Sequence, residues 1–223
     1  MGTTLGRALM ATPVVTTDTW VRADWDSFVH LADAPAYERA KFYYNRGWMR
    51  IEMSPVGPAH ARDNNLLSQI VGVFALSRDL RLEGYITPSL RKAGLQEAQP
   101  DLAFYVGDGN RPVRGTKPID IPTTDPPSLV IEVSATTLDD DLTTKRKLYT
   151  ELGVGEYWVV DVLAGKVKIF GRAGVTELMP LEVSSVFAGL AREHLEEALR
   201  LGQGEGDTAA MRYILNLPRN TDG

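Results

Sequence analysis

The chain of 223 residues contains no cysteine and only three histidines, His30, His60 and His194. The lack of cysteine excludes disulfide scaffolds, iron–sulfur clusters, Cys-ligated zinc sites and cysteine nucleophiles. The histidines are too scattered along the chain to predict a metal-binding triad. The sequence also lacks a Gly-rich phosphate loop ending in Lys-Ser or Lys-Thr, a G-x-S-x-G nucleophile motif and an H-E-x-x-H zinc motif. Histidine-centred acid–base chemistry therefore has little support.

Long hydrophobic runs and a surplus of positive charge are missing as well. No apolar stretch approaches the ~18 residues of a membrane span, and the N-terminal segment has no hydrophobic region of the kind that signal peptides carry. We therefore expect a cytoplasmic protein with no membrane contact. With 29 acidic against 24 basic residues, the formal net charge is -5, which counts mildly against non-specific attraction to phosphates. A local basic groove is compatible with this balance, and a metal-dependent site needs acidic residues.

The patterns that are present indicate one α/β domain. Hydrophobic residues make up 43% and charged residues 24% of the chain, close to the averages for soluble globular proteins. Aromatic and branched residues on either side of Asn45-Arg46-Gly47 predict an N-terminal hairpin. Helix and strand patterns follow, including a helix over residues 186–201. We expect a flexible leader over residues 1–20, a single domain over residues 21–202 and a C-terminal tail over residues 203–223.

Two carboxylates stand where the pattern makes a charge costly. Glu132 lies inside the apolar run Leu129 to Val133, which predicts a central strand covered on both faces. An isolated ionised carboxylate there must be neutralised, paired or bound to a cation. Asp101 opens a second predicted strand, residues 102–106. On adjacent strands the two acids could bind a hard divalent ion, Mg²⁺ or Mn²⁺; the alternative is that Asp101 caps a turn and Glu132 pairs with a lysine.

A lysine falls among the core-facing positions of the helix expected over residues 138–152. The apolar positions of that helix form one stripe: Leu138, Leu142, Tyr149 and Leu152. Lys145 lies on the same stripe, whereas Tyr149 is assigned to the core because aromatic residues at such spacing usually pack. Either the stem of Lys145 packs while its ammonium reaches solvent, or its ammonium reaches the buried carboxylates. We favour the second arrangement, because one cation then accounts for both anomalies.

These residues resemble the PD-(D/E)xK nuclease superfamily and, more narrowly, the Uma-two family of restriction-endonuclease-like proteins. The superfamily pattern consists of Gln99-Pro100-Asp101, a later strand that contains Glu132, and a lysine. The resemblance covers roughly residues 24–190, and its segments are Met53-Ser54-Pro55 followed by His60, Pro127 to Ser134, Asp141-Leu142-x-x-Lys145-Arg146-x-x-Tyr149, and Gly153 to Asp161. The last two segments are the most distinctive.

The resemblance implies an α/β, restriction-endonuclease-like fold, with a central mixed sheet flanked by helices and the N-terminal hairpin as an extension. It also implies that Asp101 and Glu132 are metal ligands, assisted by the backbone carbonyl of Val133. The lysine of the superfamily normally stands two residues after the glutamate, where this chain has Ser134. As in this family generally, its role is expected on the following helix, at Lys145.

The chain departs from the family upstream of these motifs. Relatives often carry a glutamate just before the hairpin turn, where this chain has Phe42 or Tyr43. Glu52 is the nearest acidic residue expected to approach the site, and Glu38 is the weaker candidate. We assign Glu52 a supporting role, in which it holds a second ion or its water shell.

The predicted function is metal-dependent hydrolysis of phosphodiester bonds by an endonuclease, with DNA as the favoured nucleic acid. An Mg²⁺ or Mn²⁺ ion held by Asp101 and Glu132 would polarise a phosphoryl oxygen and activate a water. Lys145 would orient that water and offset the developing negative charge. His60, at the start of a long helix, either donates to a phosphate or caps and packs the helix. A symmetric homodimer would suit a duplex cutter.

Two other classes of protein are compatible with the same features. A catalytically inactive nuclease-like module that serves in binding or assembly is favoured by the missing upstream glutamate and the acidic net charge. A structural dimer, in which a pair between Lys145 and Glu132 only fixes the packing, is the third hypothesis.

Overall fold

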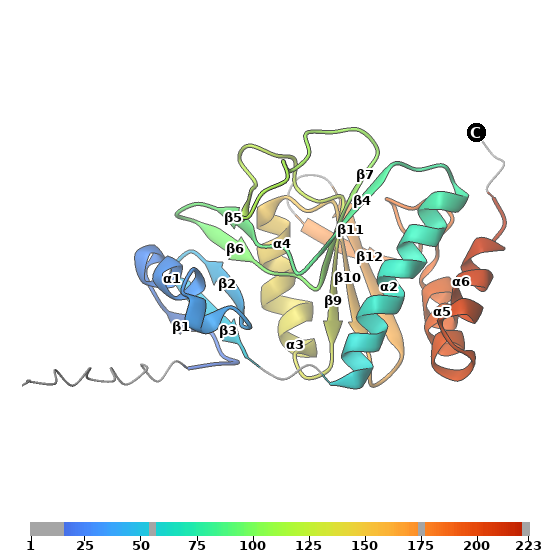
Figure 1. The fold of residues 1–223 in the computed structure, drawn as a ribbon, viewed down its shortest axis with the longest axis horizontal. Coiled ribbons are helices and arrows are strands. Elements are labelled where there is room, and N and C mark those ends of the chain that lie inside the picture. Colours follow the sequence, from blue (N-terminus) through green and yellow to red (C-terminus); the bar gives the residue numbers. More distant parts are fainter. Residues whose placement is uncertain (1–15, 54–56, 174–176, 220–223) are drawn as a thin grey trace, which may run out of the picture.

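The structure, a computed structural model, describes residues 16–53, 57–173 and 177–219. It contains two β-sheets, and the helices pack on them (Figure 1). The larger, C-terminal sheet has the strand order β12-β11-β10-β9-β7-β4. Its strands are β4 (Leu82–Ile86), β7 (Leu102–Val106), β9 (Leu129–Ser134), β10 (Glu156–Asp161), β11 (Lys166–Ala173) and β12 (Glu177–Leu181). Strands β9 and β10 are parallel and the other neighbours are antiparallel. The sheet is therefore mixed, as predicted.

The N-terminal sheet contains the predicted hairpin and has the strand order β1-β3-β2-β6-β5-β8. Its strands are β1 (Val21–Arg22), β2 (Lys41–Asn45), β3 (Trp48–Glu52), β5 (Leu90–Lys92), β6 (Gln96–Ala98) and β8 (Ile119–Asp120). Arg46 and Gly47 turn the hairpin with φ angles of 46° and 91°, the left-handed geometry that a tight hairpin turn requires. Helix α1 (Trp25–Ala32) and the short 3-10 turn η1 (Pro35–Tyr37) pack on the hairpin through an aromatic cluster around Phe28.

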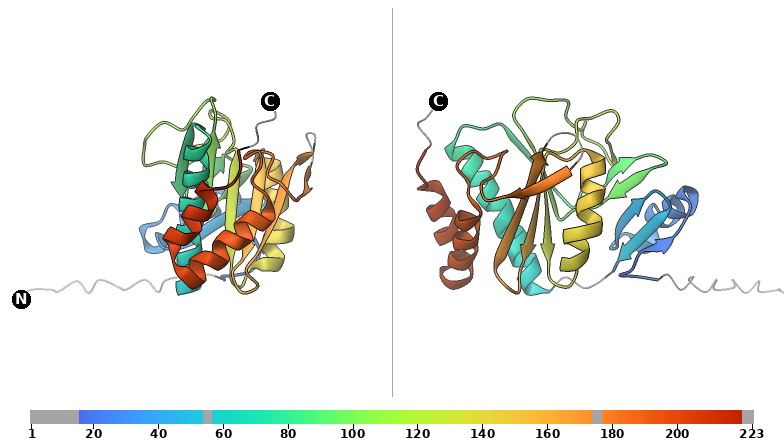
Figure 2. Two further views of the ribbon diagram at one scale, coloured as in Figure 1. Left: turned by 90° about the vertical axis from the view of Figure 1, so that its right-hand side faces the viewer. Right: turned by 180° about the vertical axis from the view of Figure 1, so that it is seen from behind.

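The remaining helices cover both faces of the C-terminal sheet (Figures 1 and 2). One face carries α2 (Pro58–Ser77), α5 (Arg192–Glu205) and α6 (Asp207–Leu215). The other carries one continuous helical segment, made of α3 (Leu138–Asp140), the π-helical turn η2 (Asp141–Lys145) and α4 (Arg146–Leu152). Leu148 and Tyr149 of this segment share a core with Leu90 and Ala98 of the N-terminal sheet, so the segment lies between the two sheets. The predicted α/β class, with a mixed sheet flanked by helices, is confirmed.

Helix α5 begins later than the predicted start at residue 186. It starts at Arg192, and the segment before it is held in a loop by the buried carboxylate of Glu156. This carboxylate accepts hydrogen bonds from the backbone N–H groups of Ser185 (2.7 Å) and Val186 (3.3 Å). These bonds satisfy backbone N–H groups that a helix would otherwise satisfy, so the loop is stable. The hydrophobic pattern of the sequence did not reveal them.

The two ends of the chain bear on the expected domain boundaries. Most of the expected leader, residues 1–20, lies outside the described residues, which begin at residue 16. Helix α6 belongs to the expected tail, residues 203–223, and packs against α5 and α2. The boundaries of the single domain stay a prediction. Within the described ranges, no helix combines the length and the apolar character needed to cross a membrane.

Candidate active site

Asp101 and Glu132 meet at the junction of the two sheets. Residues 99–101 connect β6 of the N-terminal sheet to β7 of the C-terminal sheet, and β7 is the antiparallel neighbour of β9, which contains Glu132. The backbone N–H of Val133 donates a hydrogen bond of 2.9 Å to Oδ2 of Asp101. Each acidic residue is only 2% exposed. The topology thus places both carboxylates in one sheltered position.

Lys41, the first residue of β2, supplies a cation that both acids contact. Its Nζ lies 2.5 Å from Oδ1 of Asp101 and 3.8 Å from Oε2 of Glu132. Burial alone would lower the pKa of Lys41, but the charges of Glu132 and Asp101 outweigh burial and raise this pKa. Burial alone would raise the pKa of Asp101, but the hydrogen bond from His60 and the charge of Lys41 hold it below its usual range. Lys41 and Asp101 therefore form an ion pair at neutral pH.

Glu132 is bound on its other oxygen by two tyrosine hydroxyls. Oε1 accepts hydrogen bonds from Tyr149 (2.6 Å) and Tyr43 (3.1 Å). Burial raises the pKa of Glu132 to about 8, although the charges of Lys145 and Lys41 oppose the increase. Tyr149 is fully buried, as predicted for a core residue, yet its hydroxyl also contributes directly to the carboxylate cluster.

Lys145 lies at the end of the π-helical turn and is 1% exposed. Its Nζ lies 2.9 Å from Oε1 of Glu52, 2.9 Å from Oδ1 of Asp141 and 3.9 Å from Oε1 of Glu132. Nζ also lies 4.1 Å from the centroid of the Tyr43 ring, within reach of a cation–π interaction. Burial alone would lower the pKa of Lys145, but the charges of Glu132, Asp141 and Glu52 raise it. The ammonium therefore faces carboxylates and not solvent, as we favoured, but its nearest partners are Glu52 and Asp141. The cation that contacts both Asp101 and Glu132 is that of Lys41. π-Helical turns such as the one that ends at Lys145 are often found at functional sites.

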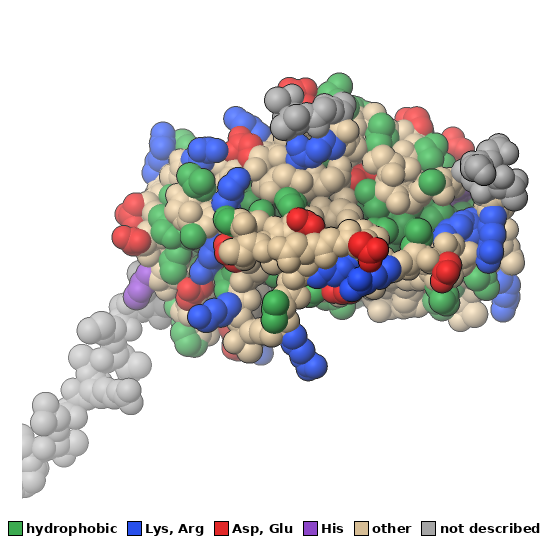
Figure 3. All heavy atoms as spheres, turned by 90° about the horizontal axis from the view of Figure 1, so that it is seen from above, with side chains coloured by type: hydrophobic (Ala, Val, Ile, Leu, Met, Phe, Trp, Pro, Cys, Tyr) green, Lys and Arg blue, Asp and Glu red, His purple; other side chains and the backbone are tan. Residues whose placement is uncertain are grey.

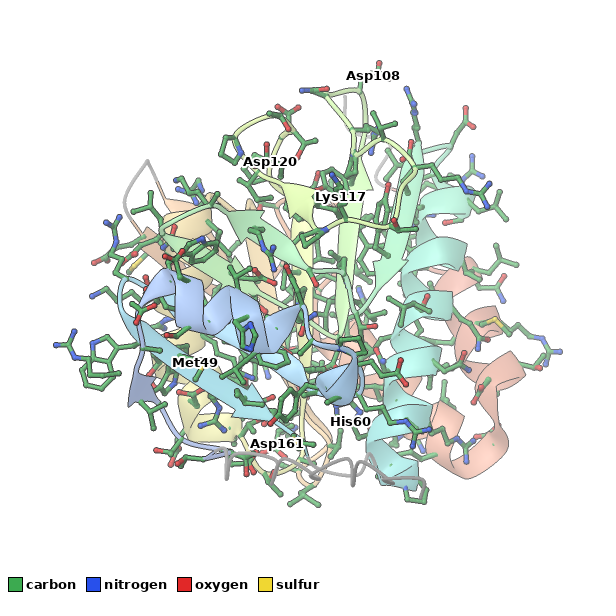
Figure 4. The ribbon with its side chains drawn as sticks, turned by 60° about the vertical axis from the view of Figure 1, so that its left-hand side comes forward. Met49, His60, Asp108, Lys117, Asp120 and Asp161 are labelled. Atoms are coloured by element: carbon green, nitrogen blue, oxygen red, sulfur yellow. The ribbon has the colours of Figure 1, made fainter. Side chains whose placement is uncertain are left out.

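The two predicted supporting residues approach the same position. Glu52 ends β3 and stands directly opposite Lys41 in the hairpin register, and its Oε1 accepts a hydrogen bond of 2.8 Å from Arg50. His60 lies in the first turn of α2, with Nε2 3.4 Å from Oδ1 of Asp101. Figure 4 shows His60 at the lower end of that helix, close to the N-terminal hairpin. Both side chains therefore belong to the cluster around the two acids.

One pocket of about 400 Å³ is lined by the predicted site residues. The residues predicted for the site that line it are Asp101, Glu132, Val133, Lys145, Glu52 and His60. Lys41 lines it as well, and Glu38, the weaker acidic candidate, is an exposed residue on its wall. The structure thus brings the predicted residues together, while their catalytic roles stay predictions.

Lys41 and Tyr43 are the site residues that the sequence did not single out for these contacts. Alternate residues of a strand face the same side, so Lys41 and Tyr43 share one face of β2, whereas Phe42 packs into the aromatic cluster on the other face. Of Phe42 and Tyr43, the two residues expected at the position where relatives often carry a glutamate, Tyr43 is the one whose side chain contacts Glu132. The alternation was visible in the sequence, but nothing there indicated that this face of the hairpin meets Glu132.

The donor groups of this cluster suit a hard divalent cation. Among the described residues, no group of three or more His, Asp or Glu side chains is arranged to hold a metal ion. The pair Asp101 and Glu132 nevertheless already contacts one cation, the ammonium of Lys41. Proteins commonly bind Mg²⁺ through one or two carboxylates, with water and substrate phosphate as the other ligands. Two carboxylates that converge on a cation therefore fit Mg²⁺ or Mn²⁺.

Comparisons with known proteins agree with the motifs and the fold. A solved structure described as "a putative nuclease belonging to DUF820", from Anabaena variabilis ATCC 29413, is similar to this chain, with a TM-score of 0.54 and 19% sequence identity. The similarity covers 79% of this chain and 99% of that one, and it establishes the restriction-endonuclease-like fold. Among curated proteins, none matches this chain. The family model Uma2, described as "Putative restriction endonuclease", matches residues 25–204. The chain therefore belongs to the Uma2 family.

Proposed function

We propose that this protein is a cytoplasmic endonuclease that uses Mg²⁺ or Mn²⁺ to hydrolyse phosphodiester bonds of DNA. The observation that carries the proposal is the convergence of Asp101, directly before β7, and Glu132, in the neighbouring β9, on one cation in a shared pocket. Buried charge clusters add little net stability compared with apolar packing, and residues with strongly shifted pKa values gather at catalytic sites. Membership in a family described as "Putative restriction endonuclease" supports the same conclusion.

The chemistry follows from the predicted roles of the residues in the pocket. Asp101 and Glu132, with the backbone carbonyl of Val133, would hold the ion, which when bound polarises a phosphoryl oxygen and lowers the pKa of a water. The ammonium of Lys145 orients the attacking water and offsets the negative charge that develops on the phosphate. His60, on the wall of the pocket, donates a hydrogen bond to a neighbouring phosphate.

The charge of the surface bears on how nucleic acid would bind. On the face shown in Figure 3, Lys and Arg side chains are interspersed with Asp and Glu, and the net charge of the chain is -5. Non-specific attraction to phosphates is therefore weak, and binding depends on the basic groups at the pocket, among them Arg39, Lys41 and His60. A two-fold symmetric homodimer would present one such pocket to each strand of a duplex.

A cleavage assay on the full chain tests the proposal. Supercoiled plasmid and single-stranded DNA are incubated with the protein in Mg²⁺, in Mn²⁺ or in chelator. We expect cutting with either ion and none with chelator. Asp101→Asn lowers the rate at least about 100-fold, because it removes a charged group aimed at the reacting centre. Asp108→Asn is the matched control, since this side chain is 94% exposed. Equal cutting by wild type and Asp101→Asn would identify a contaminant and contradict the proposal.

A catalytically inactive binding module is the second candidate. The observation in its favour is that Tyr43, and no acidic residue, contacts Glu132 from β2, in agreement with the expectation that this chain lacks the upstream glutamate of its relatives. This hypothesis predicts a metal-dependent gel shift of DNA with no cleavage of any substrate. If the protein neither shifts nor cuts DNA, the purely structural role of the pair between Lys145 and Glu132 is the hypothesis that survives.

A further inference from the structure

The ammonium of Lys41 contacts the two carboxylate oxygens that an added cation would need. Oδ2 of Asp101 is engaged by the backbone N–H of Val133, and Oε1 of Glu132 is engaged by the hydroxyl of Tyr149. The oxygens outside these two bonds are Oδ1 of Asp101 and Oε2 of Glu132. These are the two oxygens that lie 2.5 Å and 3.8 Å from Nζ of Lys41.

Lys145, the second buried lysine, does not balance the negative charge of the same two oxygens. Lys145 is bound by Glu52 and Asp141, each at 2.9 Å, and it approaches Glu132 only on the Oε1 side, at 3.9 Å. Lys41 is therefore the lysine that balances the charge at Oδ1 of Asp101 and Oε2 of Glu132. His60 also approaches Oδ1 of Asp101, but at the longer distance of 3.4 Å.

The side chain of Lys41 is less enclosed than that of Lys145. The side chain of Lys41 is 21% exposed and that of Lys145 is 1% exposed. Both lysines line the pocket of about 400 Å³, so the ammonium of Lys41 is next to open space. A lysine ammonium on a flexible four-carbon stem can leave one partner for another without movement of the backbone.

We propose that Lys41 is a tethered counter-ion that occupies the cation position between Asp101 and Glu132, so that a divalent ion binds only when the ammonium leaves. Lys41 is thus a positioning residue. In the metal-free protein it holds the two acids together, and it thereby lowers their affinity for a divalent ion. The inference rests on the proposed function, because it assumes that the ion binds these two acids. It adds that metal affinity is limited by a residue outside the family motif.

Binding of Mn²⁺ alone to the full chain tests this inference, without any measurement of activity. Titration calorimetry compares wild type, Lys41→Met, Lys41→Gln and the control Lys147→Met, whose side chain is 74% exposed. Removal of a positive charge within 4 Å of the ion position should tighten Mn²⁺ binding at least about tenfold. We expect this gain for both Lys41→Met and Lys41→Gln. The Gln variant keeps a hydrogen-bond donor, so it replaces Lys41→Met in the comparison if the apolar variant fails to fold. Lys147→Met should bind as wild type does.

Each outcome decides the inference, and failure of the proposed function is distinguishable. Tighter binding by the Lys41 variants that is lost on adding Asp101→Asn supports it. If wild type binds Mn²⁺ and the folded Lys41 variants bind no more tightly, the inference is wrong and the proposed metal site stands. If neither wild type nor the Lys41 variants bind Mn²⁺, the inference and the metal-dependent function are both overturned.

Discussion

The Nζ of Lys145 lies 2.9 Å from Oε1 of Glu52, which joins the helical segment beside the C-terminal sheet to the last residue of the N-terminal hairpin. Both side chains are largely removed from water, at 1% and 13% exposure. Asp141 and Arg50 complete this network, at 2.9 Å from Lys145 and 2.8 Å from Glu52. The predicted catalytic lysine therefore also connects the hairpin to the rest of the fold.

Lys145→Met should destabilise the protein by about 3–5 kcal/mol, because it removes the cation that lies 2.9 Å from the buried carboxylate of Asp141 and leaves Glu52 with Arg50 alone. The measurement is urea unfolding at neutral pH. Lys147→Met, two residues away and largely exposed, should change the free energy of unfolding by less than about 0.5 kcal/mol. Near-neutral behaviour of Lys145→Met would contradict the network as described.

Tyr149→Phe should destabilise the fold by about 1–3 kcal/mol, because it removes a buried hydroxyl that donates to Oε1 of Glu132 at 2.6 Å. The matched control is Tyr85→Phe, whose hydroxyl makes a longer bond of 3.4 Å to Glu83 and should contribute less than about 0.5 kcal/mol. Equal losses of unfolding free energy in the two variants would contradict a stabilising hydrogen bond from Tyr149 to Glu132.

Stability should depend on pH through Glu132, whose pKa is raised to about 8 by burial. A carboxyl with a raised pKa in the folded state stabilises the fold fully below its ordinary pKa, and this contribution is lost as the pH rises toward 8. In chelator, the unfolding free energy of wild type should therefore fall relative to that of Glu132→Gln between pH 5 and pH 8, by at most roughly 1.4 kcal/mol per pH unit. A difference between the two proteins that stays constant over this range would show that Glu132 is ionised throughout.

The parts of the fold that the sequence predicts well are those with strong local patterns. Strand β9 follows from a continuous apolar run, and the hairpin follows from a short turn between aromatic strands. The end of helix α5 was not predictable in this way. Helix α5 continues through Gly202 to Glu205. A Cβ atom at Gly202 would lie 2.2 Å from Cδ2 of Leu66, so this glycine allows close packing against helix α2 and does not end helix α5.

The candidate site divides in the same manner. Glu132 and Lys145 stand out in the sequence because each places a charge in an apolar pattern. Lys41 gives no such signal, since a lysine at the start of a strand is ordinary, and its contact with Asp101 depends on how the two sheets meet. The π-helical turn that ends at Lys145 was not predictable either, because the stripe of apolar residues predicts an ordinary helix there.

The central claim is that Asp101 and Glu132 together hold a divalent ion. The most direct test is a crystal structure of the protein crystallised with Mn²⁺, in which anomalous scattering data locate the ion. The account predicts one Mn²⁺ peak in contact with both carboxylates, with the ammonium of Lys41 moved away from them. Crystals that contain Mn²⁺ only elsewhere, with Lys41 still bound to Asp101, would contradict it.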